Sequence, residues 1–183
     1  MNENKFIQLL KKGDEKAFET LYNEYASKIY GLLRSYLKED EIEDALQDVY
    51  VRIYRGIKGF KQRSKLSTWI YKITVNTAKN YLKKQKKNYL SLDFNLEKNK
   101  FTSKENVEKD VFDEIDYEFI LNSIEKLPPL DKTIIKLRDI EGLSYYEISK
   151  IIDKPVGTVK SRLHYSRKKL QKIIEEDQNE GNG

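Results

Sequence analysis

The sequence predicts an all-α protein of two small helical domains joined by a flexible linker, the second of them a helix-turn-helix (winged-helix-like) domain. Three prolines and eight glycines in 183 residues leave few positions that interrupt helices. Apolar residues recur every three or four positions, and this periodicity fades once, between residues 88 and 114. We therefore expect a domain over residues 1–87, a linker over 88–114, a domain over 115–175 and a disordered tail over 176–183.

The first domain is expected to begin with two helices. Phe6, Leu9 and Leu10 predict a short helix that stops near Gly13, and Asp14 is a suitable N-cap for the next one. The second helix has a long apolar stripe, which predicts a core helix with the inward residues Phe18, Leu21, Tyr22, Tyr25, Ile29, Leu32, Leu33 and Tyr36.

The third helix, over about residues 40–55, carries an acidic surface. Residues 39–48 hold six acids and no base. The expected inner face is Ile42, Leu46, Val49 and Ile53. The outer face then presents Asp44, Gln47, Asp48 and Val51. Such a face is either a solvated acidic surface or a docking surface for a basic partner, and the residues leave both readings open.

The next stretch has the opposite charge, because residues 49–92 hold twelve Lys or Arg and no acid. A loop over residues 60–66 should lead to a helix that is capped by Ser67 or Thr68 and reaches about Lys87. Aromatic and basic residues interleave here, as on proteins that bind the unstacked bases of single strands. The candidates for such contacts are Phe60, Lys61, Arg63, Lys65, Trp69, Lys72, Asn76, Lys79, Asn80 and Lys83. For Trp69 individually, core packing is the alternative.

The second domain is expected to hold two supporting helices, ended by Pro128-Pro129 and near Gly142, and then a helix-turn-helix. Ser144 and Glu147 form a capping-box pattern at the start of its first helix. The second helix has an apolar face and an opposite polar, basic face suited to phosphates and base edges. Candidate DNA contacts on and beside that face are Thr158, Lys160, Ser161, Arg162, His164, Tyr165, Arg167 and Lys168. The alternative is a surface helix with solvated lysines.

Composition excludes several classes of protein. The chain has no cysteine and a single histidine, His164, so a thiolate or histidine-rich zinc site is excluded. The basic surfaces lack the carboxylate cluster that a Mg²⁺-dependent nucleic-acid enzyme needs. We therefore expect no enzymatic activity and no cofactor or metal. A net charge of +5 favours a polyanionic partner. Without a signal peptide or a run of about 20 apolar residues, no membrane insertion and a cytoplasmic location are expected.

Seven sequence blocks, in order and at matching spacing, resemble the sigma-70 family of bacterial RNA polymerase sigma factors, in its extracytoplasmic-function (ECF) group. They are Ala17, Phe18, Leu21 and Tyr22; residues 42–50; residues 67–73; residues 76–82; Leu127 and Pro128; residues 141–145; and residues 155–163. The resemblance covers nearly the whole chain.

The resemblance implies the division of labour between the surfaces. The acidic helix, with Asp44, Gln47, Asp48 and Val51, would dock on the clamp of the largest subunit of core RNA polymerase. Residues 60–83 would recognise and melt the minus-ten element of promoter DNA, and the helix-turn-helix would read the minus-thirty-five element. The flap of the second polymerase subunit and an anti-sigma factor are further implied partners.

Two alternatives remain open at the level of sequence. An ordinary helix-turn-helix regulator would also bind duplex DNA, although it would not need the acidic docking face or the basic-aromatic segment. The linker is also compatible with two arrangements of the domains, a closed pair with hidden DNA-binding faces and a splayed pair.

Overall fold

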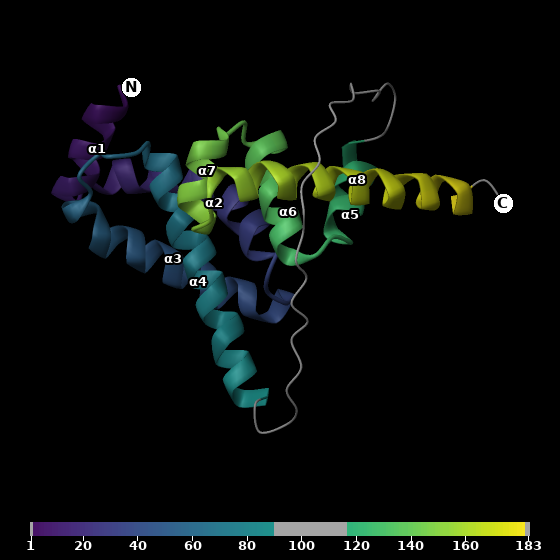
Figure 1. The fold of residues 1–183 in the computed structure, drawn as a ribbon. Coiled ribbons are helices and arrows are strands. Elements are labelled where there is room, and N and C mark those ends of the chain that lie inside the picture. Colours follow the sequence, from purple (N-terminus) through teal and green to yellow (C-terminus); the bar gives the residue numbers. More distant parts are fainter. Residues whose placement is uncertain (1, 90–116, 182–183) are drawn as a thin grey trace.

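The computed structural model describes residues 2–89 and 117–181, and within these ranges every regular element is a helix. The N-terminal domain holds α1 (Glu3–Lys12), α2 (Glu15–Leu33), α3 (Glu39–Gly56), the short 3₁₀ turn η1 (Ile57–Gly59) and α4 (Leu66–Tyr89) (Figure 1). The C-terminal domain holds α5 (Tyr117–Glu125), α6 (Pro129–Ile135), the π-helical turn η2 (Lys136–Ile140), α7 (Tyr145–Ile152) and α8 (Val156–Gly181). The predicted all-α class is confirmed, and no β wing occurs in the described part of the C-terminal domain.

Local capping sets several of the helix boundaries. Gly13 ends α1 in the left-handed region, with φ of 79°, where glycine carries no steric penalty. Asp14 Oδ1 then accepts a hydrogen bond of 2.9 Å from the Ala17 N–H and begins α2. In the C-terminal domain, Ser144 and Glu147 form the predicted capping box, in which the Ser144 N–H donates to Glu147 Oε2 at 2.8 Å.

The start of α4 differs from the sequence-based expectation. The helix begins at Leu66, and the two expected caps, Ser67 and Thr68, lie inside it. The Leu66 N–H instead donates to Glu3 Oε1 of α1 at 3.0 Å. A carboxylate from a distant helix therefore satisfies one of the free amides at the α4 N-terminus, which no local sequence pattern reveals.

The end of the chain also differs from expectation. The helix α8 continues to Gly181, so residues 176–181 of the expected disordered tail are helical. Lys126 from the segment after α5 pairs with Asp177 at 2.5 Å, which gives this last part of α8 a contact with the rest of the domain. Most of the predicted linker, residues 90–114, lies outside the described residues, and Asn88 and Tyr89 belong to α4.

The two domains pack against each other. The helix α4 lies against α7 (Figure 1). Buried apolar residues of both domains form one continuous core. The expected buried face of α4, with Ile70, Thr74 and Thr77, is buried in the structure. The contact with α7 covers a further part of the α4 surface. The structure thus shows packed domains and not a splayed pair, but it differs from the expected closed pair because the basic residues of α8, such as Lys160 and Lys168, are exposed and not hidden.

Candidate nucleic-acid interface

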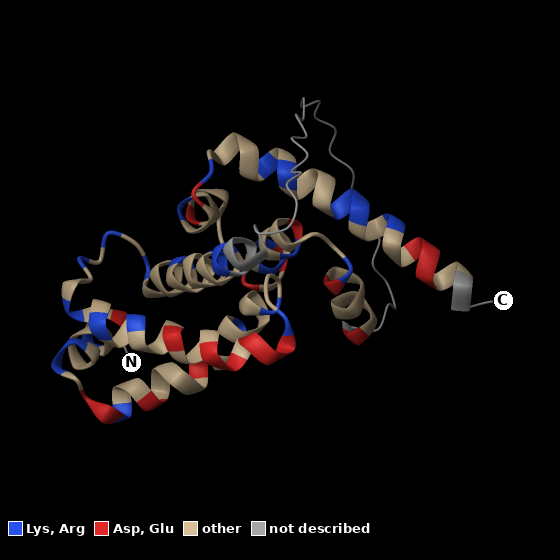
Figure 2. Cartoon of the chain, turned by 90° about the horizontal axis from the view of Figure 1, so that it is seen from below, with Lys and Arg blue, Asp and Glu red and all other residues tan. Residues whose placement is uncertain are grey.

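The helix α8 presents a basic face from the C-terminal domain. Its apolar side, with Val159 and Leu163, is buried against the domain, which turns the opposite side outward. From Val156 to Lys172 it has no acidic residue, and Figure 2 shows acids only near its C-terminal end. Exposed members of the predicted set are Thr158, Lys160, Arg167 and Lys168, and half-buried ones are Ser161, Arg162, His164 and Tyr165.

The aromatic residue Tyr145 supports this face from α7. The Lys160 ammonium lies 5.7 Å from the centre of the Tyr145 ring, and the Arg138 guanidinium lies 4.7 Å from it. Both distances permit cation–π contacts. Lys160 is exposed. The Tyr145 ring also holds it near α7, as expected of a lysine that is positioned to bind a phosphate.

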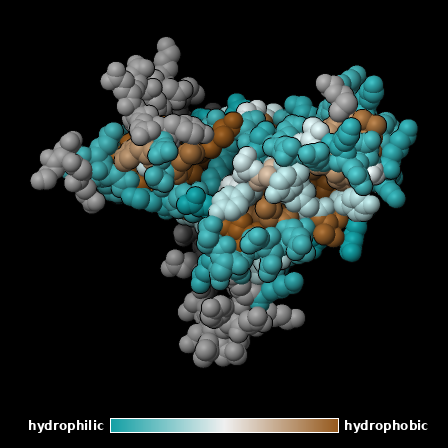
Figure 3. All heavy atoms as spheres, turned by 180° about the vertical axis from the view of Figure 1, so that it is seen from behind, coloured by the Kyte–Doolittle hydropathy of each residue, from teal (hydrophilic) through white to brown (hydrophobic). Residues whose placement is uncertain are grey.

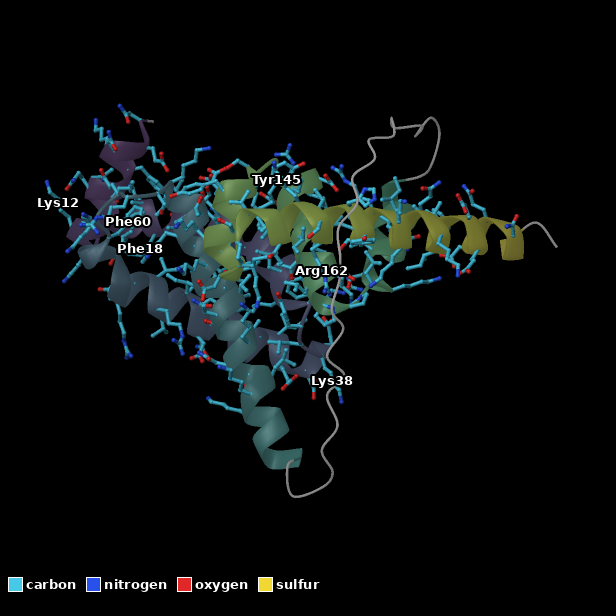
Figure 4. The ribbon with its side chains drawn as sticks, in the orientation of Figure 1. Lys12, Phe18, Lys38, Phe60, Tyr145 and Arg162 are labelled. Atoms are coloured by element: carbon cyan, nitrogen blue, oxygen red, sulfur yellow. The ribbon has the colours of Figure 1, made fainter. Side chains whose placement is uncertain are left out.

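Two arginines of the predicted DNA-binding set, Arg162 and Arg167, form ion pairs within the C-terminal domain. Arg162 Nε donates to Asp131 Oδ1 at 2.5 Å where α8 passes α6, and Lys169 Nζ donates to Asp131 Oδ2 at 2.9 Å (Figure 4). Burial alone would raise the pKa of Asp131, but the hydrogen bonds from Lys169 and Arg162 hold it below its usual value. Arg167 likewise pairs with Asp139. In this structure Arg162 anchors α8 to α6 instead of facing outward with Lys160.

A second basic surface lies on α4 and the loop before it. Lys61, Arg63, Lys72, Asn76, Asn80 and Lys83 are exposed, as the sequence predicts. Lys65 pairs with Glu147 of α7 at 3.0 Å, and Lys79 Nζ donates to the Ile152 carbonyl at 3.1 Å. Desolvation lowers the pKa of Lys79. The C-terminal domain therefore touches one edge of this surface.

The aromatic residues of this segment support the loop from within. Phe60 is only 6% exposed and packs on the half-buried Trp69, with ring centres 5.0 Å apart (Figure 4). Trp69 also covers Gly56, where an added Cβ would come within 3.1 Å of the indole ring. In this structure Phe60 belongs to the core, so it cannot stack on a base without moving. The contacts of Trp69 with Phe60 and Gly56 fit its alternative role as a packing residue.

The acidic outer face of α3 is accessible. Asp44, Gln47 and Val51 are exposed, and Val51 retains 40% of its surface. Asp48 is half-buried and accepts a hydrogen bond of 3.2 Å from the Tyr81 hydroxyl of α4. The four residues predicted for docking therefore share one helix face, but Asp48 also ties α3 to α4.

Exposed aromatic residues extend this face, and the sequence-based prediction missed them. Tyr22 was expected in the core but is 50% exposed, and Tyr54 is 57% exposed. Tyr22 packs on Tyr50 at 5.0 Å between ring centres, and Phe18 packs on Tyr54 at 5.1 Å. Seen from behind, brown and pale side chains gather over α2 and α3 (Figure 3). We call Asp44, Gln47, Asp48, Val51, Tyr22, Tyr50 and Tyr54 the α3 surface.

Comparisons with family models match both halves of the chain. The model for sigma-70 region 2 matches residues 21–88, and the model for sigma-70 region 4 matches residues 119–170. The chain is 35% identical to the ECF RNA polymerase sigma-E factor of Haemophilus influenzae, with 96% of each chain covered. It is also 35% identical to the ECF RNA polymerase sigma-E factor of Escherichia coli K12, with 96% of this chain and 95% of the relative covered.

Solved structures share the fold. The sigma factor RpoE of Bartonella quintana, solved with the anti-sigma factor NepR, has a TM-score of 0.67 at 21% identity, with 87% of this chain and 98% of that chain covered. CnrH, solved with the cytosolic domain of CnrY, has a TM-score of 0.65 at 18% identity, with 96% of this chain and 98% of that chain covered.

Proposed function

The chain belongs to the sigma-70 family, in its ECF group, and we propose how its surfaces divide the work of an RNA polymerase sigma factor. Proteins of this family bind core RNA polymerase, direct it to promoters and take part in initiation without catalysis of their own. The chain is such a factor. One observation supports this assignment of surfaces. The acidic, aromatic face lies on α3, whereas the basic faces lie on α4 and α8.

The α3 surface is proposed as the docking site for the clamp of the largest polymerase subunit. Its carboxylates suit a basic partner, and its exposed aromatic rings offer the apolar contact area that the centre of an interface needs. Tyr54 and Val51 lie beside Asp44 and Gln47 on one helix, so both kinds of contact can be made together.

The exposed basic face of α4 is proposed as the site for the melted minus-ten strand. Lys72, Asn76, Asn80 and Lys83 lie along one side of the helix, and Lys61 and Arg63 continue it onto the loop. Lysines can follow the strand backbone while amides and loop residues meet unstacked bases. Binding the separated strand lowers the free-energy cost of opening the duplex, which is how a protein without catalytic groups can promote melting.

The basic face of α8 is proposed to bind the minus-thirty-five duplex. Lys160, Lys168 and Thr158 are exposed at its N-terminal half, the part of a recognition helix that enters the major groove. Ser161, His164 and Tyr165 lie beside them, half-buried. We assign Arg162 a positioning role instead, because it holds α8 on Asp131.

We infer two further partners and a location from the family. The flap of the second polymerase subunit is the proposed contact of the C-terminal domain. An anti-sigma factor is proposed because the Bartonella sigma factor of the same fold was solved with one. None of the described helices combines the length and apolar character of a membrane span. We place the chain in the cytoplasm because its polymerase acts on DNA there.

Lys160→Ala tests the duplex-binding face. We expect lower affinity for any duplex and a plot of log K against log salt that is shallower by about one, because one phosphate contact is lost. Fluorescence anisotropy of a labelled duplex at several salt concentrations measures both.

Lys169→Ala is the matched control, since Lys169 lies on the opposite side of α8 and binds Asp131. For this variant the slope of log K against log salt should equal that of the parent chain. An unchanged slope for Lys160→Ala, or an equal change in both variants, contradicts the proposed duplex-binding face.

A further inference from the structure

The helix α1 contacts the loop before α4 at both of its ends. At the first end α1 packs against η1, which leads directly into the loop at Phe60. The apolar side of α1, with Phe6 and Leu10, is buried. At the second end Glu3 Oε1 of α1 accepts the hydrogen bond of 3.0 Å from the N–H of Leu66, the first residue of α4. One short helix therefore holds the two points between which the loop runs.

The middle of the loop, residues 61–64, has few bonds that could fix its shape. All four side chains are exposed. Within the described part of the chain, no backbone amide of these four residues donates a hydrogen bond. Gln62 nevertheless has a φ of 54°, in the left-handed region that residues other than glycine rarely adopt. Such a conformation persists only where the surroundings impose it. We attribute it to the two fixed ends of the loop.

The shape of the loop matters because Lys61 and Arg63 belong to the surface that is proposed to meet the melted strand. A loop that is already ordered loses less conformational freedom when it binds, so its affinity is higher. The position of Glu3 agrees with such a role. A carboxylate at the edge of a basic surface repels a polyanion, so its charge alone would weaken strand binding. Its hydrogen bond to the end of the loop is the contribution that can offset this repulsion.

We propose that Glu3 is a positioning residue for strand binding. Through the Leu66 amide it holds the loop, with Lys61 and Arg63, in the shape that receives unstacked bases, and it does not itself touch the strand. The helix α1 lies before residues 21–88, which match the model for sigma-70 region 2, and this inference gives it a part in strand binding. The inference rests on the proposed role of α4 and its loop in binding the melted strand.

The test uses three variants of Glu3 in the full chain. Glu3→Ala removes the acceptor of the Leu66 N–H. Glu3→Asp keeps the negative charge but is one methylene too short for the same bond. Glu3→Gln loses the charge and keeps a side-chain oxygen that can accept the bond. Glu15→Ala is the matched control, because Glu15 is the first residue of α2, as Glu3 is of α1, and both are exposed.

Two binding measurements separate the loop from the rest of the chain. Fluorescence anisotropy measures the affinity for a labelled random-sequence ten-nucleotide single strand and for a labelled random-sequence duplex. The duplex is the proposed ligand of α8, which Glu3 does not contact. Lys72→Glu, a reversal on the exposed face of α4, is the reference for lost strand binding.

Trp69 reports on the position of the loop in the same variants. It is the single tryptophan of the chain, and its ring centre lies 5.0 Å from that of Phe60, where the loop begins. Acrylamide quenching of its fluorescence measures how accessible the indole ring is. Glu3→Ala should be quenched more strongly than the parent chain, because a loop released at Leu66 covers the ring less well. Glu3→Gln should be quenched like the parent.

In Glu3→Ala we expect the single-strand affinity to fall about fivefold, the effect of one lost hydrogen bond, and the duplex affinity to stay within about twofold of the parent. Glu3→Asp should show the same loss, and it decides the test if Glu3→Ala does not fold. Glu3→Gln should bind the single strand at least as tightly as the parent, and Glu15→Ala should match the parent. The sign is decisive, because loss of a negative charge alone would strengthen binding to a polyanion.

An unchanged or higher single-strand affinity in Glu3→Ala, together with a loss in Lys72→Glu, overturns the positioning role. Equal losses for single strand and duplex also overturn it, because a destabilised fold has that effect. Weaker strand binding with unchanged quenching of Trp69 contradicts the proposed action through the loop. If Lys72→Glu binds the single strand like the parent, the strand-binding face of α4 is wrong, and the proposed function of α4 fails together with this inference.

Discussion

The Asp44→Lys variant is expected to bind core RNA polymerase about 100-fold or more weakly than the parent chain, and to keep its fold. Asp44 is exposed and holds no packing position, so the substitution changes the surface and not the core. It places a cation where a basic partner should dock, and like charges across an interface cost several kcal/mol. Microscale thermophoresis with labelled core polymerase measures the affinity, and circular dichroism measures the fold.

Glu176→Lys is the matched control for this charge reversal. Glu176 lies near the C-terminal end of α8, outside the α3 surface, and its side chain is 61% exposed. This control should bind core polymerase like the parent. If Asp44→Lys binds core polymerase normally, the α3 surface is not the docking site.

Tyr54→Ala on the parent background completes the test of the α3 surface. The ring is 57% exposed and packs on Phe18. If the aromatic residues contribute apolar contact area at the centre of the interface, the variant should weaken core binding by about tenfold or more. An affinity equal to the parent would restrict the docking site to the carboxylates.

The second large effect is expected at α4, where Lys72→Glu should reduce promoter opening by about tenfold or more. Lys72 is exposed in the middle of the strand-binding face, and its reversal replaces a phosphate contact by repulsion. Permanganate reactivity of unpaired thymines measures opening, and electrophoretic mobility of the polymerase complex measures binding before opening. The first should fall far more than the second.

A template with a premelted minus-ten region refines this result. Opening is no longer needed there, so Lys72→Glu should recover part of its activity. Lys16→Glu, an exposed reversal on α2, is the matched control and should behave like the parent on both templates. Equal losses in complex formation and opening by Lys72→Glu would assign Lys72 to general DNA affinity and not to the melted strand.

Features that depend on contacts between residues close in the sequence could be predicted, and features that depend on distant residues could not. The capping residues Asp14 and Ser144 bond amides three positions away, so their patterns are visible in the sequence and both were confirmed. The start of α4 depends on Glu3, 63 residues before it, and was placed wrongly for that reason. The bond from the Tyr71 hydroxyl to Glu141 joins α4 to the other domain, which no helical periodicity within α4 could indicate.

The same distinction applies to the site. The exposed lysines of α4 and α8 followed from helical spacing alone. Arg162 has the same chemistry as its neighbours, but a buried Asp131 on another helix engages it. Phe60 and Tyr22 exchanged their expected roles, Phe60 being buried and Tyr22 exposed, because aromatic residues serve both in cores and at interfaces. Only tertiary contacts separate these cases.

The measurement that tests the central claim most directly is run-off transcription with purified core polymerase, this chain and a set of genomic DNA fragments. We predict discrete transcripts that begin at fixed positions, depend on the chain and disappear with Asp44→Lys, together with permanganate-reactive thymines just upstream of each start. A chain that protects closed duplex sites by itself, and yields no chain-dependent transcript with core polymerase, would contradict the account and would instead describe an ordinary duplex-binding regulator.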